Sequence, residues 1–248
     1  MTAEAFVRSV QLRPAEDGKQ PLGYPWELPA IEALTSGLEL HPAVTYLIGE
    51  NGSGKSTLLE ALAVAAGMNA EGGSSNFAFS TRDSHSELWE SVVLVRGTRR
   101  PRTDFFLRAE SLFTAATYLE RLPREDGDPL ASYGGSSLHE QSHGESFLAV
   151  MLNRFGPDGL YLLDEPEAAL STQNCLTCLR RIHELVLDGS QFIIATHSPI
   201  VLAYPQATIY SCEDRGLEQV AYEDAEPVRL MQSFLDARER FLERLLSN

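Results

Sequence analysis

The chain is short of positive charge. Its 248 residues include 20 lysines and arginines against 35 aspartates and glutamates, giving a formal charge of −15 and a pI near 4.8. Non-specific binding to DNA or RNA depends on basic side chains that neutralise phosphates, so nucleic-acid binding is unsupported, though not excluded. One basic cluster lies between Arg96 and Arg108. It could meet phosphate or an acidic protein, but a solvated hairpin is the favoured interpretation.

Cysteines and long apolar stretches are also scarce. Cys175 and Cys178 form a lone C-x-x-C, and Cys212 stands apart. No second ligand pair follows at zinc-finger spacing, so free thiols in a reducing compartment are favoured over a redox or metal role. No apolar run approaches the roughly 20 residues that cross a bilayer. The first residues lack the basic start and apolar run of a secretory signal. We therefore expect a cytoplasmic protein with no membrane insertion.

The most informative segment that is present satisfies the pattern G-x-x-x-x-G-K-[S/T]. Residues 44–48 read as a buried strand before it and residues 58–66 as a helix after it. Glycines let successive N–H groups surround a polyphosphate, and the helix N-terminus adds further donors. Lys55 should reach the β- and γ-phosphates, and Ser56 should bind Mg²⁺. A chance match is disfavoured by the strand–loop–helix context. The expected nucleotide-binding residues are Gly49, Glu50, Asn51, Gly52, Ser53, Gly54, Lys55, Ser56 and Thr57.

Two carboxylates follow a second buried strand. Residues 160–163 are all apolar, and Asp164 and Glu165 come directly after them. Ligands bind at the carboxyl edge of parallel sheets, so Asp164 is expected to hold Mg²⁺ and Glu165 to polarise the attacking water. The alternative, a pair of acids that caps the next helix, is weaker in a chain that also contains a phosphate-binding loop. His197 follows the apolar strand 191–195, where an imidazole can bond the γ-phosphate. That placement favours a functional over a structural histidine.

The pattern along the chain predicts an α/β fold of the P-loop NTPase type. We expect a mostly parallel sheet flanked by helices, with an antiparallel β portion and a helical and loop insertion. The chain is interpreted as one ATPase domain over 1–248, with the insertion at roughly 68–155. Strands are predicted at 6–12, 88–96 with its partner 104–107 across the basic turn, 208–210 and 217–222. Helices are predicted at 31–34, 111–122, 146–155, 172–187 and, as one amphipathic tail, 227–245, with loops at 68–86 and 124–138.

These motifs, in this order, resemble an ATP-binding cassette ATPase. In that family's terms 49–57 is the Walker A loop, 160–165 the Walker B strand, Glu165 the catalytic glutamate, 168–171 the D-loop and His197 the switch histidine. The resemblance also places a signature sequence at 141–145, before the helix. It implies that Ser142, His143, Gly144 and Glu145 contact the γ-phosphate of ATP held by a second subunit, so that ATP drives dimerisation.

Two departures from the family pattern bear on function. His143 and Glu145 replace the glycine and glutamine usual in transporter signatures, and no glutamine lies between Thr57 and Gln141 to serve as the Q-loop. Glu110 falls in that region, although spacing alone does not assign it. The adenine-stacking residue is left open among Phe6, Tyr24 and Trp26. The run Leu-Leu-Asp-Glu-Pro-Glu resembles the soluble, non-transporter branch, which includes chromosome-maintenance and recombination ATPases and stand-alone predicted AAA-type ATPases of bacteria.

The sequence is compatible with three functions. The leading hypothesis is a Mg²⁺-dependent ATPase that closes as a head-to-tail homodimer on two ATP molecules, with Lys55, Glu165 and His197 as catalytic residues and Ser56 and Asp164 at the metal. The second is the nucleotide-binding subunit of a membrane transporter. The third is an ATP-gated DNA-maintenance or defence module. The partner of the cycle is left open.

Overall fold

The structure is a computed structural model that describes residues 4–14, 21–70, 72–74, 88–110, 142–213 and 216–247. Its strands are β1 (Val7–Leu12), β2 (Leu38–Glu39), β3 (Val44–Gly49), β4 (Val92–Arg96), β5 (Thr103–Arg108), β6 (Gly159–Asp164), β7 (Gln191–Ala195), β8 (Thr208–Glu213) and β9 (Gly216–Val220). Its α-helices are α1 (Pro29–Glu32), α2 (Lys55–Ala66), α3 (Leu88–Ser91), α5 (His143–Arg154), α6 (Thr172–Leu187), α7 (Pro199–Leu202), α8 (Glu226–Asp236) and α9 (Arg238–Leu246). Short 3₁₀ turns occur at η1 (Ala33–Thr35), η4 (Pro166–Ala168) and η5 (Tyr222–Asp224).

The larger sheet has the order β5-β6-β7-β3-β8-β9. Every neighbouring pair from β5 to β8 is parallel, and β9 closes the edge antiparallel to β8. The mostly parallel sheet expected from the sequence is confirmed. Because parallel strands present their carboxyl ends at one edge, the segments that follow β3, β6 and β7 converge there. Those segments carry the phosphate-binding loop, the Asp-Glu pair and His197.

Side chains alternate between two apolar cores on the two faces of this sheet. In β3, Tyr46 and Ile48 join the core that contains the buried face of α6, while Leu47 joins the core that contains α2. In β6, Tyr161 and Leu163 face the first core and Leu162 faces the second. A strand buried on both faces needs a continuous apolar run rather than an alternating one. This explains why 160–163 has no polar residue.

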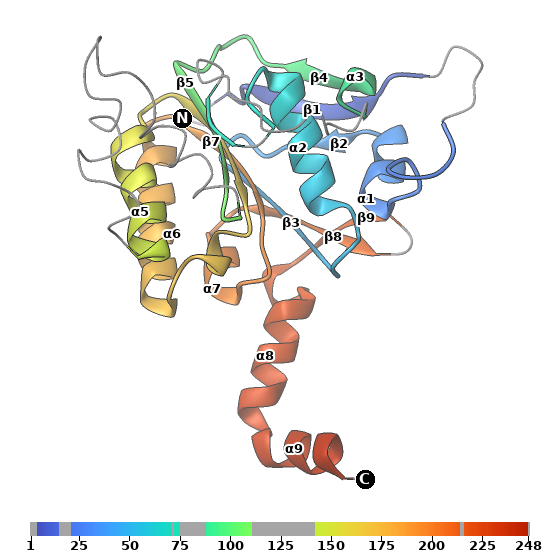
Figure 1. The fold of residues 1–248 in the computed structure, drawn as a ribbon, viewed down its shortest axis with the longest axis vertical. Helices are drawn as coiled ribbons and strands as arrows, with labels where there is room; N and C mark the ends of the chain where they lie inside the picture. Colours follow the sequence, from blue (N-terminus) through green and yellow to red (C-terminus); the bar gives the residue numbers. More distant parts are fainter. Residues whose placement is uncertain are drawn as a thin grey trace.

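Helices and a second sheet cover the two faces (Figure 1). Figure 1 shows α5 and α6 side by side against one face of the larger sheet and α2 on the opposite side. A three-stranded antiparallel sheet, β2-β1-β4, lies beyond α2 and shares its core. This is the antiparallel portion predicted from the sequence.

The predicted pairing of 88–96 with 104–107 is wrong. Residues 88–91 form the helical turn α3, β4 pairs with β1, and β5 pairs in parallel with β6 in the other sheet. All three apolar residues 105–107 are buried, and they alternate between the two cores. If this segment paired with β4 in the smaller sheet, only one of its faces would be buried. It therefore joins the larger sheet, which buries both faces.

The basic segment is not a hairpin, because β4 and β5 lie in different sheets, but it is solvated in part: Arg96, Arg100 and Arg102 are exposed. The Arg99 guanidinium bonds Asp158 and lies 4.9 Å from the ring centroid of Phe6. Arg102 pairs with the same aspartate at 3.6 Å, and Arg108 pairs with Glu60 and Asp164. Three of the arginines are therefore held in ion pairs.

Several local predictions agree closely with the structure. The helix 172–187 and the strand 191–195 have the predicted bounds. The tail predicted as one helix at 227–245 forms α8 and α9, which are separated by a break at Ala237. The segments 111–122 and 124–138 and most of 68–86 lie outside the described residues. No helix among the described segments combines the length and apolar character required to cross a membrane.

Candidate nucleotide-binding site

Glycines at two positions allow the loop between β3 and α2 to form. Gly49 has a φ of 141°, and a Cβ atom there would lie 2.4 Å from the Cys212 carbonyl oxygen of β8. Gly54 caps the start of α2 with a φ of 96°, and a Cβ there would lie 2.9 Å from that of Leu28. Only glycine combines this conformation with so close an approach. The loop thus leads into the N-terminus of a 12-residue helix, where free N–H groups favour an anion.

Lys55 is folded back over this loop. Its Nζ donates to the carbonyl oxygens of Gly49 at 2.7 Å and Glu50 at 2.9 Å. Burial lowers the pKa of Lys55, and nearby Cys212, Glu165 and Asp164 oppose that shift. A charged amine held at the mouth of the loop is positioned to exchange carbonyl oxygens for phosphate oxygens. Ser53 Oγ, also in the loop, is buried with no hydrogen-bond partner within the described structure.

The two predicted metal ligands meet although they are 108 positions apart in sequence. Ser56 Oγ donates to Asp164 Oδ1 at 2.9 Å. Burial raises the pKa of Asp164 to about 6, with Arg108 and Ser56 acting against the rise and Glu165 and Glu110 adding to it. A hydroxyl and a buried carboxylate at the phosphate-binding loop are the oxygen donors that Mg²⁺ uses together with substrate phosphates. The residues present therefore fit the metal.

Glu165 lies in a strained backbone conformation at the end of β6. Its φ of 49° and ψ of 55° are left-handed, a region that glutamate rarely occupies. Its N–H donates to the Ala195 carbonyl at 3.0 Å, which fixes the peptide between β6 and β7. Strain of this kind persists where surrounding structure holds it and is concentrated at functional sites. His197 Nε2 lies 3.7 Å from Glu165 Oε1 and has no hydrogen-bond partner among the described atoms.

Glu167 is a site residue that the sequence analysis did not single out. Its Oε2 accepts from Thr196 Oγ1 at 2.7 Å, and its Oε1 accepts from the His197 backbone N–H. Thr196 Oγ1 in turn accepts from Ser198 N at 3.1 Å. One carboxylate on η4 thus fixes the loop that presents His197. The only sequence signal was the acid two positions after Glu165, which had no assigned partner.

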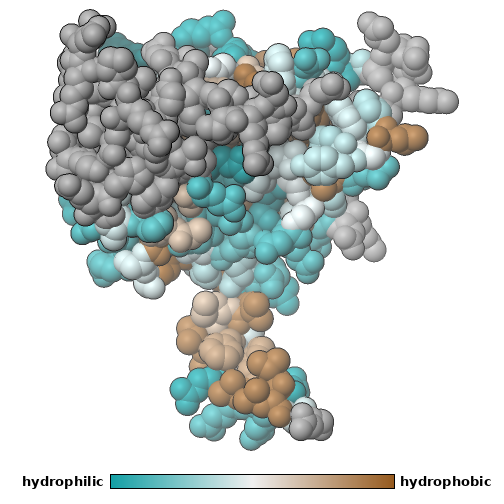
Figure 2. All heavy atoms as spheres, viewed as in Figure 1, coloured by the Kyte–Doolittle hydropathy of each residue, from teal (hydrophilic) through white to brown (hydrophobic). Residues whose placement is uncertain are grey.

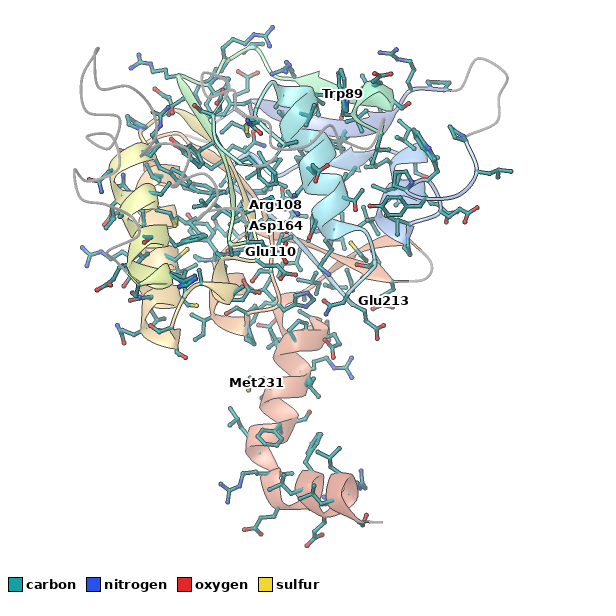
Figure 3. The ribbon with its side chains drawn as sticks, in the orientation of Figure 1. Trp89, Arg108, Glu110, Asp164, Glu213 and Met231 are labelled. Carbon is teal, nitrogen blue, oxygen red and sulfur yellow. The ribbon has the colours of Figure 1, made fainter. Side chains whose placement is uncertain are left out.

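Arg108 and Glu110 extend the site on the β5 side (Figure 3). Figure 3 shows Arg108, Asp164 and Glu110 together beside α2. Arg108 Nε lies 3.3 Å from Asp164 Oδ2, and its Nη1 is 2.9 Å from Glu60 Oε2 on α2. Glu110 lines a small cavity with Ser56, Asp164 and Glu165. Arg108 therefore neutralises part of the negative charge that these carboxylates bring to one point.

A pocket of about 400 Å³ opens over the phosphate-binding loop. Its lining includes Tyr24, Leu28, Glu110 and Glu165. The structure separates the three aromatic candidates for adenine stacking. Phe6 is buried beneath Arg99 and Trp26 packs against the core, whereas Tyr24 is 75% exposed at the pocket. Of the three, Tyr24 alone is placed to stack on a base bound there.

The signature residues lie apart from this pocket. Ser142 and Glu145 form a capping box at the start of α5: the serine Oγ accepts from the Glu145 N–H, and the serine N–H donates to the Glu145 carboxylate. A Cβ on Gly144 would lie 3.0 Å from the Ala169 carbonyl of the D-loop segment. None of Ser142, His143, Gly144 and Glu145 lines the pocket over the phosphate-binding loop. Within one chain, the signature and the loop are not brought together.

The C-x-x-C pair lies on α6, where Cys175 interacts with Ser198 of the segment that follows His197. Cys175 and Cys178 are buried free thiols on α6. Burial raises the pKa of Cys178 to about 12, and its Sγ contacts Met151 Sδ at 3.6 Å. Both cysteines are free, as the sequence predicts.

Comparisons with known proteins agree with this geometry. Residues 44–110 match the family described as "AAA domain, putative AbiEii toxin, Type IV TA system". The chain is 25% identical over 215 residues to the ABC transporter G family member STR2 of Medicago truncatula, covering 79% of this chain and 28% of that protein. The chain thus spans little more than a quarter of that relative's length.

Two solved structures that are similar to this chain are matched over almost their whole length. The SMC head domain from Thermotoga maritima has a TM-score of 0.44 and 16% identity over 86% of this chain and 98% of that one. CbiO1 of Clostridium perfringens, part of an ABC transporter complex, has a TM-score of 0.46 and 16% identity over 94% and 97%. The family match and the curated relative agree with the loop geometry: the chain has a P-loop NTPase fold and is similar to ATPases of the ATP-binding cassette and AAA kind.

Proposed function

We propose that this protein is a Mg²⁺-dependent ATPase whose two copies close head to tail on two ATP molecules and reopen after hydrolysis. The observation that carries the proposal is the 2.9 Å hydrogen bond between Ser56 Oγ and Asp164 Oδ1. It joins the phosphate-binding loop to the Asp-Glu strand at a single point. A phosphate-binding fold that served only as a scaffold would have no need to place a buried carboxylate there.

Each residue has a role that follows from its position. Lys55 and the loop N–H groups would bind the β- and γ-phosphates, and Tyr24 would stack on the base. Ser56 and Asp164 would hold Mg²⁺, which would offset the negative charge of the phosphates. Glu165 would orient the attacking water, and His197, opposite its carboxylate, would contact the γ-phosphate.

The head-to-tail dimer is supported by where the signature lies. Ser142 caps a 12-residue helix whose N-terminus suits an anion, yet it does not line its own chain's phosphate-binding pocket. A second copy would place this helix N-terminus opposite the nucleotide. We therefore assign Ser142, His143, Gly144 and Glu145 to the partner's ATP site, as the cassette resemblance implies.

Two other functions are less well supported. A transporter subunit fits the name of the plant relative, but Glu110 stands near the metal site where transporters use a glutamine. A defence module fits the matched family description. The ion-paired Arg99 and Arg108 leave less of the basic cluster available for DNA.

Glu165→Gln tests the proposed chemistry. The amide has nearly the same shape but cannot polarise water as a carboxylate does, so turnover should fall by about 100-fold or more. ATP binding should stay within a few-fold of the parent, because the phosphate and metal ligands are unchanged. Phosphate release and equilibrium nucleotide binding are the two measurements.

Glu223→Gln is the matched control, since Glu223 lies in η5 outside the site. It should leave both quantities unchanged. Unaltered turnover in Glu165→Gln, with binding intact, would remove the assignment of this residue as the catalytic carboxylate.

A further inference from the structure

The C-terminal helical segment 226–247, here called the tail, is an unusually apolar surface. Among the described residues, 13 large apolar side chains are well exposed, and seven of them lie in the tail. The seven are Leu230, Met231, Leu235, Phe241, Leu242, Leu245 and Leu246. Figure 2 shows these residues gathered on the tail below a mostly polar body. Contiguous exposed apolar patches mark interaction sites, whereas single exposed residues do not.

The tail has a defined shape rather than a frayed end. Val228 and Ala225 are buried in the core beside α7, which anchors the base of α8. Phe234 of α8 and Phe241 of α9 meet edge to face with ring centroids 5.8 Å apart. Beyond its base the tail extends away from the body, as Figure 1 shows. On α8 the exposed Met231 and Leu235 are four positions apart, and on α9 Leu242 and Leu245 are three apart, spacings that place apolar side chains on one face of each helix.

The charges of the tail favour one kind of partner for its apolar face. The tail carries four arginines and four carboxylates, a formal charge of zero, in a chain whose total is −15. Its acids are Glu226, Asp236, Glu239 and Glu243, and its arginines are Arg229, Arg238, Arg240 and Arg244. A segment with equal numbers of interspersed acids and arginines carries charges of both signs, so a second copy about a twofold axis can offer an opposite charge to each. Such a neutral segment has no net attraction to an anionic membrane or to nucleic acid.

We propose that the tail is a self-association surface, and that the tail of a second copy covers its apolar face without any nucleotide. Two bodies of like charge repel each other, and the neutral tails are where two copies can approach at least electrostatic cost. This goes beyond the proposed ATPase, because the pairing would exist before ATP binds. Paired tails would also hold the nucleotide sites of the two copies near each other, which raises the effective concentration at which the two sites meet.

The base of the tail is joined to the candidate active site. Tyr222, just before α8, donates its hydroxyl to the Pro199 carbonyl at 3.0 Å, and Pro199 begins α7 two residues after His197. The paired tails would thus be attached directly to the segment that presents His197.

The test is the solution mass by light scattering in EDTA without nucleotide. The parent protein should have about twice the 27.4 kDa chain mass. The variant with both Leu235→Gln and Leu245→Gln should be a monomer. A symmetric pair buries each of these leucines once in each copy, so the loss of their apolar contacts should weaken association roughly 100-fold. Far-UV circular dichroism should be unchanged, since both side chains are largely exposed.

Matched variants make the outcome specific. Leu176→Gln combined with Leu187→Gln removes two similarly exposed leucines from α6 and should remain a dimer. Lys55→Ala should also remain a dimer, which separates this proposal from the ATP-driven one. A monomeric parent, a dimeric tail variant, or dissociation of the α6 variant would overturn the proposal. So would a parent that is monomeric and sediments with anionic vesicles.

Discussion

The side chains at the candidate site differ in how firmly the structure holds them: two are fixed by hydrogen bonds, and one is largely exposed. Lys55 is held by the Gly49 and Glu50 carbonyls, and Ser56 is held by Asp164. Tyr24, by contrast, is largely exposed at the pocket. In the proposed ATP complex, the phosphate end of the site would thus be preorganised, whereas the base end would depend on one exposed ring.

Tyr24→Ala should weaken ATP binding roughly 5- to 100-fold, because stacking of a base on an aromatic ring contributes about 1–3 kcal/mol. Tyr24→Phe keeps the ring and should bind like the parent. Equilibrium titration with a fluorescent ATP analogue measures both. Leu22→Ala, at a 92% exposed neighbour on the same segment, is the control. An equal loss in that control would show that the segment, and not the ring, is responsible.

Short connections between elements place Glu165 and His197, the other residues to which we assign a catalytic role. The peptide of Glu165 is fixed to β7 by its bond to Ala195, and Glu167 on η4 fixes the residues that follow β7. The Asp-Glu strand and the His197 loop therefore form one hydrogen-bonded unit. Displacing either side of it should displace the other.

Glu167→Ala should lower turnover by about tenfold or more while ATP binding changes little. It leaves the Thr196 hydroxyl and the His197 N–H without their acceptor, and a buried unsatisfied group costs about 1–3 kcal/mol. If Glu167 acts through His197, the substitution should add little to the loss already caused by His197→Ala. Steady-state kinetics of the two single variants and the double variant measure the coupling.

Glu184→Ala is the control, because Glu184 lies on the surface of α6, where it pairs with Arg180 and Arg181. It should leave turnover unchanged. Fully additive effects of Glu167→Ala and His197→Ala would contradict the positioning role.

At the scale of the whole molecule, the described residues offer two candidate surfaces for contact between copies: the carboxyl edge of the larger sheet, and the tail, which extends from the body beyond α7. The base of the tail lies close to the segment that carries His197. Because different residues form the two surfaces, substitutions can examine one contact at a time.

In the Leu235→Gln, Leu245→Gln background, Glu165→Gln should be a monomer that becomes a dimer on addition of Mg·ATP. Blocked hydrolysis keeps the ATP in place, so closure should be stable enough to measure by light scattering. Adding Lys55→Ala should abolish the ATP-dependent change. A mass unaffected by Mg·ATP, with nucleotide binding confirmed, would rule out the head-to-tail closure of two copies.

Local patterns in the sequence were sufficient for several elements. The helix 172–187 and the strand 191–195 have the predicted bounds because their apolar spacing and flanking residues are unambiguous. The pairing of 104–107 was mispredicted because adjacency in sequence favours a hairpin, whereas burial of both faces of β5 favours the larger sheet. No local pattern marked Glu167, since its partners lie about 30 positions away.

The sequence by itself determined the chemistry that is available: a phosphate-binding loop with its lysine and serine, an Asp-Glu pair and a histidine after a strand. Each depends on residues close together in the chain. Only the tertiary structure decided which groups meet. The order of the parallel strands brings Ser56 and Arg108 to Asp164, and the turn before α1 brings Tyr24 to the pocket. The physical reason is that strand order is set by burial of both faces of the sheet, a property of the whole core rather than of any segment.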